Sequence, residues 1–310
     1  MNNEKRIMVT GASGFLGKAL VETLLHEKGG EIIAVCRTDA HCRTWQHHPH
    51  LHTVSADLSV EKEIQTLMAD TRPEIIFHLA AVARLGDGEQ HPEKAIKTNL
   101  LGSMGLLQQA AKYGTKKFLF TSSDLARAAK STVGISKLLM ENYLRLFPKP
   151  LPQVISFRMP NLYGFPGSVM DIFARQIAKN QDLTITDERM ARRFIHREEA
   201  VSYLFYLLEK GENHQIYSVK QEPLFIKDLA LQMIADSGKN LQLRVIGARP
   251  GEKLFQASYA DTEAADTGYG HLALLRLPPP SIEQIFACIQ QLPVSREWQA
   301  LLQNRFQQLF

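Results

Sequence analysis

Three glycines spaced three residues apart are the first feature of this sequence that could bind a ligand. Gly11 and Gly14 lie between a short apolar segment and a helical pattern that begins at Leu16, and Gly17 is the second residue of that pattern. In a strand–turn–helix, the first glycine permits a tight turn, the second lets the backbone approach a pyrophosphate, and the third lets the helix pack on the sheet. The phosphates then rest on amides of the helix N-terminus. The sequence therefore predicts a dinucleotide site made by Gly11, Ser13, Gly14, Phe15, Leu16 and Gly17.

The end of the second apolar segment indicates which dinucleotide binds. An acidic residue at this place binds the ribose 2′-hydroxyl of NAD, whereas an arginine accommodates the 2′-phosphate of NADP. Arg37 directly follows Cys36, and Asp39 comes two residues later. Arg37 is better placed, so we expect NADP, with NAD as the alternative. The competing interpretation is an arginine on a loop that is simply solvated.

The elements that must position this site alternate in type along the first 160 residues. Short apolar or β-branched segments alternate with longer helical patterns, which is typical of βαβ units and a parallel sheet. We predict an α/β fold of the Rossmann type, a doubly wound parallel sheet with a smaller C-terminal substrate-binding lobe. The expected strands are 6–9, 32–36, 52–55, 75–79, 117–121 and 153–157, and the expected helices are 16–26, 60–69, 92–113 and 134–147.

The pattern loosens after residue 157, where proline and glycine recur. We assign 1–158 to the cofactor-binding domain, with 195–220 returning to it, and 159–194 and 221–280 to the substrate-binding lobe. Within these ranges we expect helices at 198–208 and 226–237, strands at 215–219 and 242–246, and an ordered loop over 247–280. The last range, 281–310, is expected to be helical. Its apolar stripe should pack onto the body of the protein: Trp298, Leu301, Leu302, Phe306 and Leu309.

Composition excludes several classes of function. The net charge is only +4 over 310 residues, and no dense basic block with aromatic residues is present, so nucleic-acid binding is disfavoured. No apolar run approaches the ~20 residues that span a bilayer. Three irregularly spaced cysteines are typical of reduced thiols in a cytoplasmic protein. The histidines of 47–52 lack accompanying carboxylates or cysteines, so we expect a solvated loop and no metal site.

The glycine spacing G-x-x-G-x-x-G resembles the short-chain dehydrogenase superfamily, in particular its extended branch. The resemblance implies further contacts with the cofactor. Asp57 and Leu58 match an adenine-binding pair, and Asn99 matches a structural asparagine of the family. His78 reads as a core histidine without a catalytic role. The remaining cofactor contacts implied by the resemblance are Leu79, Ala80, Ala81, Thr121, Lys137 and Met159.

The same resemblance locates the active site and exposes a missing residue. Family members carry a serine or threonine after the fifth strand and then Tyr-x-x-x-Lys on the next helix, where residues four apart share a face. The sequence Gly134-Ile-Ser-Lys137 fixes the register and puts Val133 at the tyrosine position. A valine cannot transfer a proton, so the usual acid–base step cannot run through residue 133.

A more specific resemblance covers most of the chain. Ser123-Asp124 followed by Val133, with the segments 192–200 and 249–255, is similar to the UDP-N-acetylglucosamine 4,6-dehydratases of capsule and glycan synthesis, some of which lack the tyrosine. Those enzymes carry a lysine after the aspartate, and Leu125 stands there in this chain. The resemblance implies catalysis by Ser123, Asp124 and Lys137, with Ser123 and Asp124 relaying the C4 hydroxyl proton.

Substrate binding is inferred in the same way. Arginines bind phosphate with two parallel hydrogen bonds, so Arg193 and Arg249 are expected on the diphosphate of a nucleotide sugar, with Asn161 and Glu252 beside it. The resulting function is an oxidoreductase acting at C4 of a UDP-sugar. A catalytically weakened protein that binds NADP(H) or nucleotide sugar is the alternative. Resemblance also implies a homodimer through the helices of 92–113 and 134–147.

Overall fold

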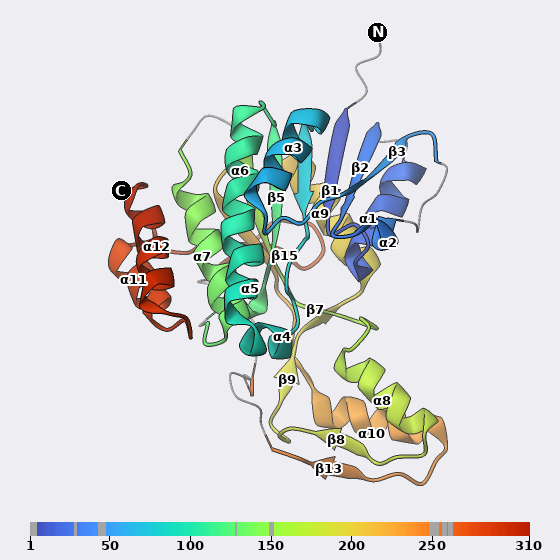
Figure 1. Ribbon diagram of the computed structural model, residues 1–310. Coiled ribbons are helices and arrows are strands. Elements are labelled where there is room, and N and C mark those ends of the chain that lie inside the picture. Colours follow the sequence, from blue (N-terminus) through green and yellow to red (C-terminus); the bar gives the residue numbers. More distant parts are fainter. Residues whose placement is uncertain are drawn as a thin grey trace.

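The computed structural model describes residues 5–27, 30–42, 48–127, 129–148, 152–247, 254–255, 259 and 263–310. The chain forms a large body around one sheet and a smaller lobe that projects from one end of the body (Figure 1). Among the described residues, no helix combines the length and the apolar character that crossing a membrane requires.

The body is built on a nine-stranded sheet in the order β14-β15-β11-β6-β5-β4-β1-β2-β3. Neighbouring strands are parallel except that β15 runs antiparallel to both β11 and β14. The predicted doubly wound Rossmann sheet is therefore confirmed. The strands are β1 (Arg6–Thr10), β2 (Glu31–Cys36), β3 (Leu51–Ser55), β4 (Ile75–His78), β5 (Lys117–Ser123), β6 (Gln153–Met159), β11 (Gln215–Val219), β14 (Ala264–Asp266) and β15 (Leu272–Leu275).

The strand order reverses between β1 and β4, because β2 and β3 extend the sheet to one side and β5 and β6 to the other. In open α/β sheets, ligands bind beyond the carboxyl ends of the strands at such a switch point. The segments that follow β1 and β4 are therefore the expected place for a cofactor.

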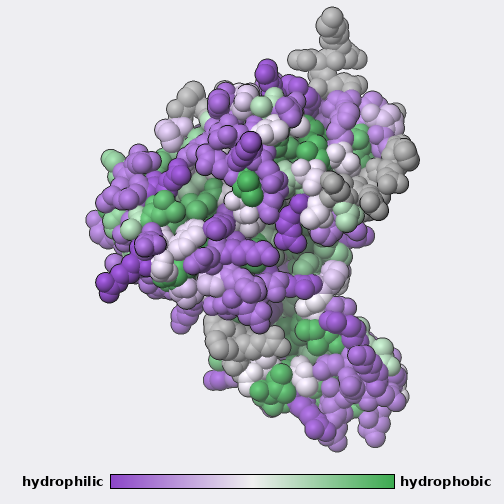
Figure 2. Space-filling model, in the orientation of Figure 1, coloured by the Kyte–Doolittle hydropathy of each residue, from purple (hydrophilic) through white to green (hydrophobic). Residues whose placement is uncertain are grey.

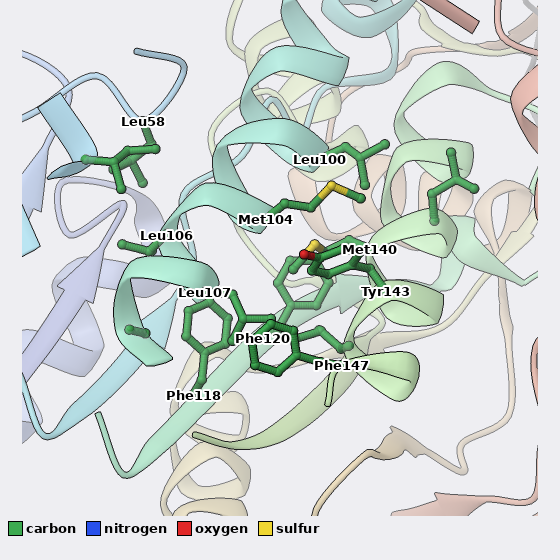
Figure 3. Close-up of a cluster of buried hydrophobic side chains, with 14 of the residues drawn as sticks. Leu58, Leu100, Met104, Leu106, Leu107, Phe118, Phe120, Met140, Tyr143 and Phe147 are labelled. Carbon is green, nitrogen blue, oxygen red and sulfur yellow. The ribbon is translucent and has the colours of Figure 1, made fainter. Parts of the chain in front are cut away.

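Helices cover both faces of the sheet and bury two apolar clusters. One cluster lies under α1 and α9, and the other lies under α3, α6 and α7. Figure 3 shows the second cluster, where Met104 of α6 and Tyr143 of α7 lie over Phe118 and Phe120 of β5. These helices are α1 (Phe15–His26), α3 (Glu61–Thr71), α6 (Ser103–Lys112), α7 (Thr132–Leu146) and α9 (Arg197–Lys210), and the short α2 (Asp39–Cys42) follows β2.

The helix predicted over 92–113 is interrupted. The chain forms α4 (Leu85–Gln90), α5 (Pro92–Ile96) and a π-helical turn η2 (Lys97–Gly102) before α6. A Cβ on Gly102 would lie 2.1 Å from the Leu58 carbonyl oxygen. The wide turn thus brings a glycine directly against the loop after β3, an arrangement that helical periodicity alone does not reveal.

The lobe has a small core of its own, centred on Phe173, Leu183, Phe194 and Ile226. Its short strands pair within the lobe or along its connection to the body. Its elements are β7 (Asn161–Leu162), α8 (Val169–Ala178), β8 (Leu183–Ile185), β9 (Ala191–Arg192), β10 (Phe194–Ile195), β12 (Leu224–Phe225), α10 (Ile226–Ser237) and β13 (Leu243–Val245).

One stretch that we expected as a loop of the lobe belongs to the body. Strands β14 and β15 lie within 247–280, and they extend the main sheet beyond β11. Gly268 and Gly270, both with positive φ, lie in the turn between them. Two strands of three and four residues are too short for their periodicity to show in the sequence. The lobe boundary at residue 280 was therefore wrong for 264–275.

The chain ends in a helical hairpin, α11 (Ile282–Gln290) and α12 (Arg296–Gln307). Each helix is capped by a serine: Ser281 Oγ accepts from the Gln284 amide, and Ser295 Oγ accepts from the Trp298 amide. The hairpin packs against α7, and Leu302 and Phe306 are fully buried. The predicted packing of this stripe onto the body is confirmed, although Leu301 is 42% exposed.

Candidate active site

The glycine loop joins β1 to α1 at the switch point. Gly11 has φ of +68°, and a Cβ there would lie 2.8 Å from the Ala80 amide nitrogen. A Cβ on Gly17 would lie 2.2 Å from the Gly11 carbonyl oxygen. Gly11 and Gly17 are therefore required for the close approach of the loop to the segment after β4 and for the tight packing of α1.

The residues of this loop fit a dinucleotide diphosphate. Gly14 is the N-cap of the 12-residue helix α1, and no side chain caps it. The amides of the first turn therefore face outward with the helix dipole behind them, which favours an anion. Phe15 and Ser13 are partly exposed around the same turn, whereas Leu16 is buried in the core. Arg37 is exposed directly after β2, at the edge where a ribose 2′-phosphate would lie.

The segment after β4 lies beside the glycine loop. Leu79, Ala80 and Ala81 are each partly exposed, and the Ala80 amide donates to Thr10 Oγ1. His78 at the end of β4 is fully buried, with Nδ1 2.7 Å from Thr10 Oγ1 and Nε2 2.7 Å from Ser103 Oγ. Burial, with a contribution from the charge of Lys137, lowers the pKa of His78 to about 3. His78 is therefore a neutral core residue that joins β1, β4 and α6.

Asn99 does not lie where a cofactor could touch it. Its side chain is fully buried, accepts from the Val82 amide and donates to the Val82 carbonyl and to Ser136 Oγ. Asn99 thus holds the segment after β4 against α7, and its assignment as a cofactor contact is corrected to this positioning role. Asp57 is similarly engaged, because its carboxylate accepts from the amide and hydroxyl of Ser59, and Leu58 is nearly buried.

Lys137 reaches the end of β5 from α7. Its Nζ donates to the Thr121 carbonyl at 2.8 Å and lies 4.5 Å from the centre of the Phe120 ring. Burial lowers the pKa of Lys137 to about 7, opposed by the charge of Glu141. Thr121 is nearly buried and donates to the His78 carbonyl, while Ser123 is partly exposed two residues later. The structure thus brings Lys137 to Thr121 near the carboxyl end of β5, the strand that ends at Ser123.

The position of the missing tyrosine is closed. Val133 is 1% exposed, and a Cβ on Gly88 of α4 would lie 2.4 Å from its Cγ2 atom. Glu89 fixes this contact, because its carboxylate accepts from the Thr132 amide at 2.7 Å. Helix α4 therefore covers the first turn of α7. Gly88 and Glu89 were missed by the sequence analysis, since nothing in the order of residues connects α4 with α7.

Asp124 and Arg193 form an ion pair that is almost completely buried. Arg193 Nη2 donates to Asp124 Oδ1, and the two side chains are 1% and 4% exposed, respectively. Arg193 also donates to the Val219 carbonyl. An arginine buried in this way does not reach a substrate phosphate, so the predicted role of Arg193 in diphosphate binding is corrected to a structural one. The Asp124 carboxylate is held next to a fixed positive charge.

Tyr259 joins this buried group. The guanidinium groups of Arg127 and Arg193 lie 4.4 and 4.7 Å from the centre of its ring. Its hydroxyl accepts from Arg158, which forms a buried pair with Glu141 of α7. The sequence offers no signal for this contact, because Tyr259 is distant in the chain from every one of its partners. Tyr259 therefore contacts three arginines, two of which belong to the buried ion pairs Arg158–Glu141 and Arg193–Asp124.

The other predicted substrate residues have different outcomes. Asn161 is exposed at the start of β7, and its Nδ2 donates to the Arg193 carbonyl. Met159 is partly exposed at the end of β6. Arg249 and Glu252 lie outside the described residues. Across the described part of the chain, no group of three or more potential metal-ligating side chains is present.

The glycine loop also contacts the connection to the lobe. The Phe15 ring meets the Phe165 ring edge-on at 6.0 Å, and the Arg197 guanidinium lies 5.4 Å from the Phe15 ring centre. Arg84, before α4, donates to the Pro166 carbonyl. Figure 2 shows that the lobe stands out from the largely hydrophilic body. Phe165 and Pro166 lie between β7 and α8, so these contacts join the glycine loop and α4 to the start of the lobe.

Comparison with known proteins identifies the family. Residues 7–273 match the family model described as polysaccharide biosynthesis protein. The chain belongs to this family. Its similarity to extended short-chain dehydrogenases, predicted from the sequence, is likewise confirmed.

Two known proteins are similar to this chain in sequence. The chain is 30% identical over 266 residues to the probable polysaccharide biosynthesis protein EpsC of Bacillus subtilis, a match that covers 81% of this chain and only 44% of that protein. It is 28% identical over 273 residues to a UDP-glucose 4-epimerase of Rickettsia felis, covering 84% of this chain and 80% of that protein.

A solved structure shows the same fold. The UDP-glucose 4-epimerase of Thermus thermophilus in complex with NAD superimposes with a TM-score of 0.71 at 21% identity, over 97% of this chain and 99% of that one. At this identity the likeness establishes the shared fold.

Proposed function

We propose that this chain is an NADP-dependent oxidoreductase of the nucleotide-sugar epimerase/dehydratase type that acts at C4 of a UDP-sugar in polysaccharide or glycan biosynthesis. Family membership supports the pathway class, and the curated Rickettsia relative is named for an activity on UDP-glucose. The uncapped N-terminus of α1 and the exposed Arg37 support the choice of cofactor.

The observation that carries this proposal is the placement of Lys137. A buried lysine whose pKa lies near neutrality is poised to exchange a proton at physiological pH. Its amine lies at the carboxyl end of β5, beside the switch point where the glycine loop and the segment after β4 meet. A structural lysine would more commonly be found paired with a carboxylate or exposed.

The proposed division of roles differs from a tyrosine-based site. A bound nicotinamide would supply the acceptor for the hydride that leaves C4. The C4 hydroxyl proton passes to Ser123 Oγ, which gives up its own proton towards the Lys137 amine. Asp124 is left out of this relay, because its carboxylate is buried and paired with Arg193. Its role is to fix the segment that carries Ser123.

A second function, a binding protein with weakened catalysis, is favoured by one specific observation. Val133 and Leu125 stand at the two positions where the sequence resemblance implies a proton-transferring tyrosine and lysine, and Val133 is buried under α4. A sensor or partner subunit needs the cofactor site but not the acid–base residues.

The two functions are separated by one experiment. The purified chain is incubated with NADP and a panel of UDP-, dTDP- and GDP-sugars in deuterated water and followed by proton NMR and mass spectrometry. New sugar signals, or deuterium at C5 of the sugar, are expected from the enzyme. Sugars that remain unchanged while NADP and a UDP-sugar bind measurably would reject the enzymatic proposal in favour of the binding protein.

The choice of NADP is tested at Arg37. Replacing Arg37 by alanine removes charged hydrogen bonds to the 2′-phosphate, each worth ~1.5–3 kcal/mol, so NADP affinity should fall by roughly tenfold or more. NAD affinity should change little. Dissociation constants for both cofactors, measured by calorimetry on both proteins, check this. Tighter binding of NAD than of NADP to the unmodified chain would reject the assignment.

A further inference from the structure

Arg84 is an exposed arginine where the body meets the lobe. It directly precedes α4, at the end of the body from which the lobe projects (Figure 1). Its Nη2 atom donates to the Pro166 carbonyl at 3.3 Å. The neighbouring Phe165 ring meets the Phe15 ring of the glycine loop. Arg84 therefore contacts the same short segment of the lobe that the glycine loop contacts.

The backbone on both sides of Arg84 is held in place. Two residues before it, the amide and the carbonyl of Val82 bond to the buried Asn99 side chain. The Arg84 carbonyl accepts from the Gly88 amide, and Glu89 ties the same helix to the first turn of α7. A ligand bound by Arg84 would therefore have to order little more than the side chain itself, which favours binding.

The Arg84 guanidinium lies where a glycine leaves it room. Gly167 of the lobe has φ of +85°, and a Cβ there would lie 3.2 Å from Arg84 Nη2 and 3.4 Å from Arg84 Cζ. The Gly167 amide donates to the carboxylate of Asp171, which is itself paired with Arg175. Within the ranges of the chain that the structure describes, no carboxylate forms an ion pair with Arg84. Its positive charge is therefore available to a ligand.

We propose that Arg84 is a substrate-binding residue that holds an oxyanion of the sugar nucleotide, either a phosphate of its diphosphate or a carboxylate on its sugar. The inference rests on the proposed function, because it assigns a residue to that same substrate. Arg193, which the sequence suggested for the diphosphate, is buried against Asp124. The planar guanidinium of Arg84 has five N–H donors, and the Pro166 carbonyl takes one of them. The others can bind an oxyanion through two parallel hydrogen bonds.

The test compares two substitutions of Arg84 that differ in charge. Arg84→Gln keeps an N–H group that can donate to the Pro166 carbonyl but removes the charge, whereas Arg84→Lys keeps the charge. Calorimetric titration with UDP, UDP-glucose and UDP-glucuronic acid should show affinity lowered by about tenfold or more in Arg84→Gln and partly retained in Arg84→Lys. Arg244→Gln, at an exposed position of β13, is the matched control and should bind like the unmodified chain.

The three ligands separate the two sources of the oxyanion. Equal losses for all three would place Arg84 on the diphosphate, whereas a loss confined to UDP-glucuronic acid would place it on a carboxylate of the sugar. Unchanged affinity of Arg84→Gln for all three, or a loss confined to NADP, would overturn the inference and leave the proposed function intact. An unmodified chain that binds none of the three would instead reject the proposed substrate class, and the inference with it.

Discussion

The pairing of Asp124 with Arg193 changes how the residues after β5 are understood. Ser123 and Asp124 are adjacent in the sequence, yet one is partly exposed and the other is buried against a guanidinium. Sequence reasoning located both, and it placed Lys137 and Val133 in register through the Gly-x-Ser-Lys pattern. It did not reveal the ion pair, because Arg193 lies 69 residues from its partner and only the fold brings them together.

Replacing Asp124 by asparagine should cost stability more than chemistry. Removing one partner leaves the Arg193 charge buried, which typically costs about 3–5 kcal/mol. Urea denaturation checks the free energy of unfolding. The control is Asp187→Asn, whose arginine partner is 75% exposed, and the loss there should stay below about 1 kcal/mol. An Asp124→Asn chain that is as stable as the unmodified chain but inactive would restore the proton-relay hypothesis.

His78 should make the protein sensitive to acid. Its folded-state pKa is about 3 and the ordinary value is 6.5, so below about pH 6.5 the unfolded chain binds a proton that the folded chain does not. The free energy of unfolding should then fall by ~1.4 kcal/mol per pH unit from this group, and the fall should end near pH 3.

Denaturation curves between pH 7 and pH 4 measure this slope. His78→Asn should be less stable at neutral pH, because it loses the bonds to Thr10 and Ser103, but its slope should be shallower by one proton. His26→Gln, at a site where the side chain is 88% exposed, is the control and should keep the slope of the unmodified chain. Equal slopes for all three proteins would contradict a neutral buried His78.

Among the elements, α4 has the largest effect on the candidate site relative to its length. Its six residues cover the first turn of α7, and Glu89 accepts from the Thr132 amide there; Arg84, directly before α4, donates to a carbonyl at the start of the lobe. Sequence analysis predicted helix 226–237 and strand 215–219 with their observed bounds, because their periodicities are regular and their ends are marked. It did not predict α4, because a six-residue helix that contains two glycines shows no recognisable helical periodicity in the sequence.

A substitution in α4 tests its contact with α7. Gly88→Ala would put a Cβ 2.4 Å from Val133 Cγ2, so overpacking should destabilise the protein by ~1–3 kcal/mol. A Cβ added at Gly86 of the same helix would have no other atom within 4 Å. Gly86→Ala should therefore leave stability unchanged or raise it by up to ~1 kcal/mol. Thermal denaturation measures both.

The double variant Gly88→Ala, Val133→Ala completes the cycle. Truncating Val133 makes room for the new methyl group, so the double variant should be less destabilised than the sum of the single variants. Additive effects would mean that α4 does not press on Val133. In that case the closed tyrosine position would need another explanation.

At the scale of the whole molecule, the lobe is a separate core attached to the body by several crossings of the chain. Sequence analysis expected two parts because the βαβ alternation stops near residue 158. It did not foresee that the chain returns to the main sheet at β14 and β15, since an edge hairpin of this length depends on β11 for its pairing partner.

The separate core predicts a selective loss of binding. Phe173 is fully buried in the lobe, and Phe173→Ala should cost about 3–5 kcal/mol, enough to unfold a core of this size locally. Calorimetric titration should then show weakened binding of UDP-sugars and nearly unchanged binding of NADP. The control is Leu231→Ala at a lobe position that is 47% exposed. Equal losses of both ligands would mean that the two parts unfold together.

The place of Phe15 has a consequence for how the two ligands influence one another. This ring belongs to the glycine loop, yet it touches Phe165 and Arg197, which lie on the connections to the lobe. On the proposed function, a cofactor that ordered this loop would change the free energy of the lobe's position, and a sugar nucleotide that moved the lobe would act back on the loop. Thermodynamic reciprocity requires that each ligand change the affinity of the other by the same factor.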